Sequence, residues 1–502
     1  MTITEMTAPT AAKLRWWALA VLMLPVLLVA VDNTVLSFAI PMISEALRPT
    51  GVELLWIVDV YPLVLAGLLI PMGSLGDRFG RRRLLLVGAT GFAVVSAVAA
   101  FAPTAGALIA ARAAMGFFGA MLMPATLSLI RNIFVDPQER RLAIAVWAAG
   151  FSGGAALGPL VGGFLLEHFW WGSVFLLAVP VLLPLLIAGL LVLPESKDPN
   201  PGRVDVLSTI LILVTMVALV WGIKSIAVYG PGLDLAVSLA VALAGGIWFV
   251  RRQLSHDNPM LDVRLFTNPV FSGAVGANLL SVFSLVGFLF FVSQHLQLVS
   301  GRTPIEAGLV LLPGLIMTVV VGLLVVRLSR FVRLGTIVVG GLLLNAVGYV
   351  LVMLTGNSGS DVGLLIAFAL LGAGVGGAET ISNDLILSAV PAAKAGAASA
   401  ISETAYEVGS VLGTAVLGGL LTSAYRTNVQ IPSGLTSEQA FAAGETLGGA
   451  LDVAAQLPAA LAEPLLASAR HAFDSGVTLT SAVGVVLMIV AAVLARVTLK
   501  RA

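Results

Sequence analysis

Long apolar segments recur along almost the whole of this 502-residue chain. Each is about 20 residues long, the length that an α-helix needs to cross the hydrocarbon core of a bilayer. Hydrophobic residues make up 59% of the chain and charged residues 11%, too few to cover a water-soluble protein with polar surface. The sequence therefore predicts an all-α polytopic membrane protein, in which the first apolar segment is a retained helix rather than a signal peptide.

Polar residues, glycine and proline divide the apolar segments into fourteen predicted spans. They cover residues 16–39, 54–75, 84–102, 106–130, 142–164, 172–193, 206–224, 233–250, 270–293, 306–326, 335–354, 362–388, 395–421 and 476–496. Most of the 27 Lys and Arg residues fall in alternate connections, which predicts cytoplasmic segments at both termini, residues 1–15 and 497–502. The outer connections are assigned only Arg48, Lys224, Arg302, Arg426 and Arg470.

Several classes of function are disfavoured by composition. The net charge of +1 and the lack of a basic tract interleaved with aromatic residues indicate no nucleic-acid partner. The chain has no cysteine for a thiolate metal site, and its histidines, at no metal-ligand spacing, are interpreted as loop or helix-end residues: His168, His256, His295 and His471. No phosphate-binding loop or catalytic set is visible, so we expect no cofactor, no metal and no enzyme.

The connection between the second and third spans reads GSLGDRFGRRRLLL. Its glycines allow close backbone approach, and an aspartate stands beside a cluster of arginines. Positive charge on a cytoplasmic connection explains the arginines, but neither the glycine spacing nor the aspartate. The pattern resembles the signature loop of the major facilitator superfamily, and its residues here are Gly73, Gly76, Asp77, Arg78, Gly80, Arg81 and Arg82.

Further segments resemble motifs of the same superfamily. The first span reads LLVAVDNTVLSFAIP, with Asp32 in the drug-exporter motif, and the fourth reads LIAARAAMGFFGA, with Arg112 as the buried arginine. The fifth reads GFSGGAALGPLVGG and resembles the antiporter motif, at Gly158, Pro159, Gly162 and Gly163. The segments WIVDVYPLVLAG and SAISETAYEVG are similar to the fourteen-helix drug:proton antiporter family of QacA-like and LfrA-like multidrug exporters. The tenth span, LLPGLIMTVVVG, lacks the acidic residue that some of these proteins carry, so handling of divalent cations is not implied.

The resemblance covers the chain end to end and implies the major facilitator fold. It implies two six-helix bundles, residues 16–193 and 270–496, two inserted helices in residues 206–250 and a cytoplasmic connector, residues 251–269. It also implies that Gly73, Asp77, Arg78 and Arg82 latch the bundles together. The long segment 425–471 is expected on the outside, either as a lid of short amphipathic helices or as a solvated spacer loop.

Charged residues inside the predicted spans are the candidates for function. Each costs at least about 2.5–3.5 kcal/mol at the bilayer centre and so needs a reason. They are Asp32, Asp59, Arg112, Glu379, Asp384, Glu403 and Glu407. Six are acidic, and an acid without a basic partner can hold either a proton or a cation. A purely structural role is open for each of them and is expected for Asp384, near the inner interface; Arg112 is a counter-ion or, by resemblance, part of the proton coupling.

Glu403 and Glu407 lie one helical turn apart, so they share a helix face, with Tyr406 beside them. Two carboxylates this close, in a span without Lys or Arg, cannot both stay ionised cheaply unless a proton or a cation relieves their repulsion. Glu379 and Asn383 share a face of another span in the same way. We therefore expect these acids to bind protons and substrate cations.

These features together predict a proton-coupled multidrug exporter that works by alternating access. The expected partners are lipophilic cationic small molecules, protons and membrane lipids. The expected form is a monomer in the inner (cytoplasmic) membrane. A proton-coupled transporter of one specific metabolite is the alternative, and a channel is disfavoured because no selectivity filter is visible.

Overall fold

A computed structural model describes residues 8–197, 205–256, 259–355, 361–390 and 395–500. These ranges form helices and their connections, without a strand. Thirteen helical segments among them are long and apolar enough to cross a membrane, and α6, with 32 residues, lies at the remaining predicted span, 142–164. The fold class is therefore confirmed. Residues 1–7 and 501–502 of the predicted terminal segments lie outside the described ranges.

The first bundle contains eight helices, and at two places a pair of consecutive helices occupies a single predicted span. Its helices are α1 (Ala8–Leu47), α2 (Gly51–Phe79), α3 (Arg81–Ala99), α4 (Ala105–Gly119), α5 (Leu122–Ile133), α6 (Pro137–His168), α7 (Ser173–Leu176) and α8 (Ala178–Val192). The breaks between α4 and α5 and between α7 and α8 each come shortly before a proline, Pro124 or Pro180. Proline has no N–H to donate to the carbonyl four residues earlier, so the helix is interrupted there.

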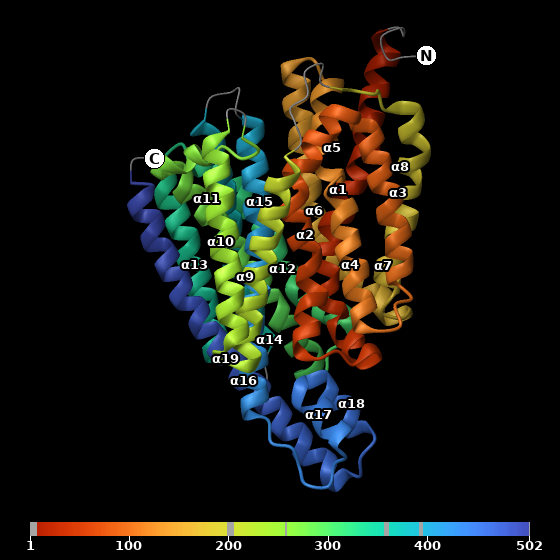
Figure 1. Cartoon of the computed structure of the whole chain (residues 1–502), viewed down its shortest axis with the longest axis vertical. Helices are drawn as coiled ribbons and strands as arrows, with labels where there is room; N and C mark the ends of the chain where they lie inside the picture. Colours follow the sequence, from red (N-terminus) through yellow and green to blue (C-terminus); the bar gives the residue numbers. More distant parts are fainter. Residues whose placement is uncertain (1–7, 198–204, 257–258, 356–360, 391–394, 501–502) are drawn as a thin grey trace.

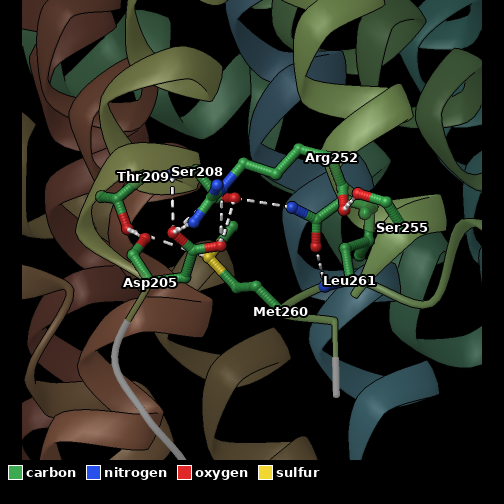
Figure 2. Close-up of polar contacts among 8 residues, drawn as sticks. Asp205, Ser208, Thr209, Arg252, Ser255, Met260 and Leu261 are labelled. Carbon is green, nitrogen blue, oxygen red and sulfur yellow. Dashed lines mark hydrogen bonds and ion pairs between the residues drawn. The ribbon is translucent and has the colours of Figure 1, made fainter. Parts of the chain in front are cut away.

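The inserted hairpin consists of α9 (Val206–Tyr229) and α10 (Leu233–Ser255), which pack against each other. Figure 2 shows how their ends are joined: Asp205, at the start of α9, accepts hydrogen bonds from Arg252 near the end of α10. Gln253 donates to Ser208 at 2.7 Å and accepts from the backbone of Leu261 at 3.0 Å. Hydrogen bonds therefore join the two helices of the hairpin to each other and to the connector that follows them.

The second bundle follows the short 3₁₀ helix η2 (Val263–Thr267). Its helices are α11 (Pro269–Gln294), the π-helical turn η3 (His295–Val299), α12 (Pro304–Leu328), α13 (Leu334–Thr355), α14 (Asp361–Ser388), α15 (Ala395–Gly413), the π-helical turn η5 (Thr414–Gly418), α16 (Gly419–Asn428) and α19 (Ala459–Thr498). Figure 1 shows the two bundles side by side. The helix α9 packs against α2 of the first bundle and against α16 and η5 of the second. The helix α1 begins and α19 ends at the same end of the molecule, as an even number of spans requires.

Two short helices, α17 (Ser437–Glu445) and α18 (Leu447–Ala455), form a cap at the opposite end of the molecule (Figure 1). Glu445 accepts a hydrogen bond from the backbone N–H of Gly51 at 3.0 Å and lies 3.3 Å from Arg426. Asp452 pairs with Arg48 at 2.8 Å. Both flanking helices extend into the predicted outer segment 425–471, since α16 continues to Asn428 and α19 begins at Ala459.

The two bundles meet through α6 with α12 and through α2 with α15. Ser293 of α11 donates to the carbonyl of Ser37 at 2.9 Å, and Gln297 of η3 donates to that of Phe38 at 3.2 Å. These hydrogen bonds, like the contacts of Glu445 and Asp452 in the cap, lie in the half of the molecule that carries the cap. The bundles are therefore closed against each other at the cap end.

Candidate transport site

Asp32 of α1 is held by a buried base. Its Oδ2 accepts a hydrogen bond from Nη1 of Arg112, on α4, at 2.8 Å. The guanidinium also donates to the carbonyl of Ile57 at 3.2 Å and lies 4.6 Å from the ring centroid of Tyr61. Arg112 is 1% exposed, so this pair fixes α1, α2 and α4 together inside the first bundle. Arg112 is therefore the counter-ion of Asp32, one of the two roles that the sequence left open for this arginine.

Asp59 of α2 is also paired, with a lysine that the span prediction assigns to an outer connection. Its Oδ2 lies 2.9 Å from Nζ of Lys224, and the two side chains are 0% and 1% exposed. The assignment of Lys224 to a connection is wrong because α9 continues to Tyr229 and so encloses the lysine. The described spans thus hold a second buried base beside Arg112, and the excess of acid is smaller than the sequence suggests.

Three acids remain without a base. No ion pair among the described residues includes Glu379 of α14 or Glu403 and Glu407 of α15. Glu407 is 5% exposed, and its Oε2 has no hydrogen-bond partner in the described structure. An unpartnered buried carboxylate is costly, so a ligand that neutralises it binds with a large gain.

Electrostatic contacts connect these acids to one another and to the first bundle. The carboxylates of Glu403 and Glu407 interact electrostatically. Those of Glu379 and Glu407 interact in the same way with the hydroxyl of Tyr406. The carboxylates of Glu407 and Asp32 both interact electrostatically with the hydroxyl of Tyr61. The guanidinium of Arg112 lies over the ring of this tyrosine. The structure therefore brings the acids of α14 and α15 together with the Asp32 pair, at the junction of the two bundles.

Two further candidates on α14 have structural roles or lie away from this junction. The side chain of Asn383 accepts hydrogen bonds from Asn278 of α11, at 3.4 Å, and from Ser402 of α15. Asn278 also donates to the hydroxyl of Ser402 at 3.0 Å, so this network joins three helices of the second bundle. Asp384 is exposed, as expected for a residue near an interface.

The signature loop makes its contacts within the first bundle. Asp77 accepts two hydrogen bonds from Arg81, at 2.8 and 2.9 Å, and Arg82 donates to the carbonyl of Leu193 at 3.0 Å and to Glu195 through its backbone. The other two residues of the predicted latch are less engaged: the Arg78 guanidinium stacks 5.8 Å from the ring of Phe79, and Gly73 has room for a side chain.

Gly80 has a backbone requirement that Gly73 lacks. Its φ of 114° lies in the region that favours glycine, and a Cβ there would come within 2.7 Å of Glu195. Glu195 in turn bonds the backbone N–H of Arg82 at 3.1 Å and lies near Arg83. The loop is thus built around the segment that follows α8.

The antiporter motif lies on α6, on two faces. Gly158 packs against Thr34 and Val31 of α1, within the first bundle. Gly163 faces α12 of the second bundle, where a Cβ would meet the backbone of Ile305 at 2.6 Å. Gly162 faces Val35, and the carbonyl of Pro159 lies against Gly308 of α12. The small residues of this motif therefore allow α6 to pack closely on both bundles.

Two buried groups were missed by the sequence prediction. Lys224 is one, and the apolar residues 226–228 shortly after it are the signal that the helix continues. The other is His295, interpreted as a loop or helix-end residue: it begins η3, is buried, and its Nδ1 lies 3.1 Å from Oδ1 of Asp474 on α19. Nothing in the sequence spacing connects a histidine to an aspartate almost 180 residues later.

Comparison with known proteins agrees with these features. Residues 22–414 match the model of the Major Facilitator Superfamily. The chain is 55% identical to the multidrug efflux pump LfrA of Mycolicibacterium smegmatis over 98% of its own length and 97% of the relative's. It is 38% identical to the methyl viologen resistance protein SmvA of Salmonella typhimurium, over 95% and 97%, and 35% identical to the tetracenomycin C resistance and export protein of Streptomyces glaucescens, over 97% and 92%.

Solved structures share the fold at low identity. A bacterial homolog of the human lysosomal transporter Spinster, in an inward-facing and occupied conformation, matches with a TM-score of 0.65 and 17% identity, over 96% of both chains. Tetrameric PepTSo2 matches with a TM-score of 0.61 and 15% identity, over 97% of this chain and 99% of the other. The family match, the relatives and the apolar helices lead to one conclusion. This chain belongs to the Major Facilitator Superfamily and is a multi-pass membrane transporter.

Proposed function

We propose that this transporter exports lipophilic cations in exchange for protons. The observation that carries the proposal is the group of three acids at the bundle junction, Glu379, Glu403 and Glu407, with which no base in the described part of the chain forms an ion pair. A proton or a cationic substrate can supply the missing positive charge. Each ligand lowers the affinity for the other by the same factor, which is the thermodynamic basis of exchange.

The surroundings of these acids favour bulky apolar cations. The ring of Tyr406 contacts that of Phe151 on α6, and Tyr61 lies close to Glu407. Aromatic faces attract cations and bury apolar surface without demanding one hydrogen-bond pattern. The names of the relatives, a multidrug efflux pump and a resistance protein for methyl viologen, itself an organic cation, support this substrate class.

Alternating access would require the bundle contacts at the cap end to open. We propose that the described state is open towards the cytoplasm, with the cap on the outside and both termini in the cytoplasm. In the described structure the signature loop bonds to the first bundle and to the segment that follows α8, so its proposed latch to the second bundle would form in the other, outward-facing state. We further propose that the protein acts as a monomer in the cytoplasmic membrane.

Proteoliposomes with an acidic interior test the proposal. On addition of ethidium outside, the wild-type protein should take up ethidium and raise the internal pH, because a proton leaves for each exchange. The double variant Glu403→Gln/Glu407→Gln should do neither, whereas Glu463→Gln, at an exposed position of α19, should behave as wild type. A pH change without ethidium would indicate a channel, and no response to a panel of lipophilic cations would favour the alternative of a single-metabolite transporter.

A further inference from the structure

A second arrangement of charge and aromatic rings lies where α2 meets the inserted helix α9. The carboxylate of Asp59 lies 2.9 Å from the ammonium of Lys224. The same ammonium lies 3.9 Å from the ring centroid of Trp56, and the ring of Trp56 is 6.1 Å from that of Trp221. Neither charged side chain is more than 1% exposed.

This is the chemistry of an ammonium-binding site. A carboxylate neutralises the positive charge, and the face of an indole attracts it further through its quadrupole. A small cavity adjoins the ammonium, lined by Val52, Trp56, Trp221, Lys224 and Ser225. The site thus has a carboxylate and two indoles, with free space beside the indoles and Lys224, and its cation is a side chain of the protein itself.

The site belongs to the junction of the bundles rather than to a remote surface. Apolar residues of α2, α9, α15 and η5 form one separate buried cluster around it: Leu63, Ala66, Met216, Val220, Val411 and Ala415. Thr414 of η5 also faces Asp59. Through Lys224 the inserted hairpin therefore places a positive charge between the two bundles.

Packing alone does not account for this pair. A buried ion pair is often no more stabilising than apolar residues of the same size, since the desolvation of both charges offsets their attraction. The neighbouring buried cluster is apolar, so apolar residues at both positions together would suit these surroundings. Stability alone therefore does not require the pair.

We propose that Lys224 is a tethered competitor of substrate cations for Asp59 and thereby sets the charge of the substrates. With the lysine in place, Asp59 is neutralised, and the junction offers only the acids of α14 and α15 to a cation. Without the ammonium, Asp59 holds a proton or a cation, so Asp59 and Trp56 become a further subsite. A dication is favoured over a monocation because its second charge can ionise this additional carboxylate. This inference rests on the proposed export of cations.

Equilibrium binding to the purified, detergent-solubilised protein tests the proposal with two probes, the monocation ethidium and the dication methyl viologen. In Lys224→Met the affinity for methyl viologen relative to ethidium should rise about tenfold. Lys224→Arg keeps the positive charge and should retain the wild-type ratio. The double variant Asp59→Asn/Lys224→Met also removes the carboxylate that the lysine neutralised. Its ratio of methyl viologen affinity to ethidium affinity should equal that of the wild type.

The outcomes separate this inference from the proposed function. If the wild-type protein binds neither ethidium nor any other lipophilic cation, the proposed function fails. If it binds ethidium but the ratio in Lys224→Met equals that of the wild type, the tethered competitor is refuted. Where Lys224→Met is too unstable for titration, the rise in melting temperature caused by methyl viologen replaces the affinity. That rise should be larger in the variant than in the wild type, and an equal or smaller rise refutes the proposal.

Discussion

The ring of Tyr406 meets the ring of Phe151 at 80°, with centroids 5.6 Å apart. Phe151 lies on α6, the helix of the antiporter motif, and Tyr406 precedes Glu407 on α15. The contact therefore joins the two bundles directly beside an acid without a base. Any rocking of one bundle against the other changes the surroundings of this acid, which is how movement and ligand exchange would be coupled.

Removal of the Tyr406 ring should impair transport more than removal of its hydroxyl. Tyr406→Ala deletes the edge-to-face contact and its apolar surface, so we expect ethidium efflux from cells to fall at least about tenfold. Tyr406→Phe keeps the ring and should retain most of the activity. Efflux rates at equal expression decide the matter, and similar losses in both variants would assign the role to the hydroxyl instead.

Asp32→Asn should destabilise the protein, because it leaves the buried guanidinium of Arg112 without its counter-ion. Breaking a buried pair in this way costs about 3–5 kcal/mol. The double variant Asp32→Asn/Arg112→Gln removes both charges and should recover part of the loss. Thermal unfolding in detergent measures both effects; an Asp32→Asn variant as stable as the wild type would show that the pair contributes nothing to the fold.

The sequence predicted the spans better than the partners of their charged residues. Apolar length and basic connections located the thirteen helical segments long and apolar enough to span a membrane, and α6, because the bilayer imposes both features on every span. The bases of Asp32 and Asp59 come from helices far along the chain, on α4 and α9, and no spacing rule reports such contacts. Lys224 shows the limit most clearly: taken alone, a lysine near the end of an apolar segment resembles a membrane boundary.

Glu403 and Glu407 were easier to identify, since two acids one turn apart in an apolar span share a face whatever the tertiary structure. Their proximity to Tyr61 of the other bundle was not predictable, because it depends on how α2 packs against α15. The roles predicted for these residues remain predictions.

Asp77→Asn in the signature loop should slow turnover far more than it weakens substrate binding. The carboxylate, near the end of α2, holds Arg81 at the start of α3 at 2.8 Å, away from the acids at the bundle junction. Its proposed function is to stabilise one conformation, so ethidium affinity should stay within about twofold while transport falls by tenfold or more. Binding in detergent and efflux in cells give the two quantities. Normal efflux in the variant would reduce the loop to a topology signal.

The ion pair of Asp205 with Arg252, which joins the ends of the inserted hairpin, predicts a stability change at acid pH. Burial by itself raises the pKa of Asp205, but hydrogen bonds from Arg252 and Ser208 outweigh it and lower the pKa from 3.8 to about 2. Because the folded pKa is the lower one, the ionised carboxylate stabilises the fold above about pH 4, and this contribution of about 2 kcal/mol is lost as the pH falls towards 2.

Asp205→Asn should therefore lower the melting temperature in detergent at pH 7, and the difference from wild type should shrink below about pH 4. Asp234→Asn, at an exposed position in the first turn of α10, is the matched control and should have little effect. An equal loss at all pH values would mean that the charge of Asp205 does not stabilise the hairpin.

The central claim is that a proton and a substrate cation exclude each other at Glu403 and Glu407. Ethidium affinity of the purified protein, measured between about pH 6 and 8.5, tests it most directly. The wild-type affinity should rise with pH, as fewer protons compete. Glu403→Gln and Glu407→Gln should each bind ethidium more weakly and with a flatter pH dependence, and the double variant should lose less than the sum of the two because the sites are coupled. If both single variants bind ethidium with the affinity and the pH dependence of the wild type, the account is contradicted. The exchange of proton and cation would then be assigned to Glu379 or Asp32.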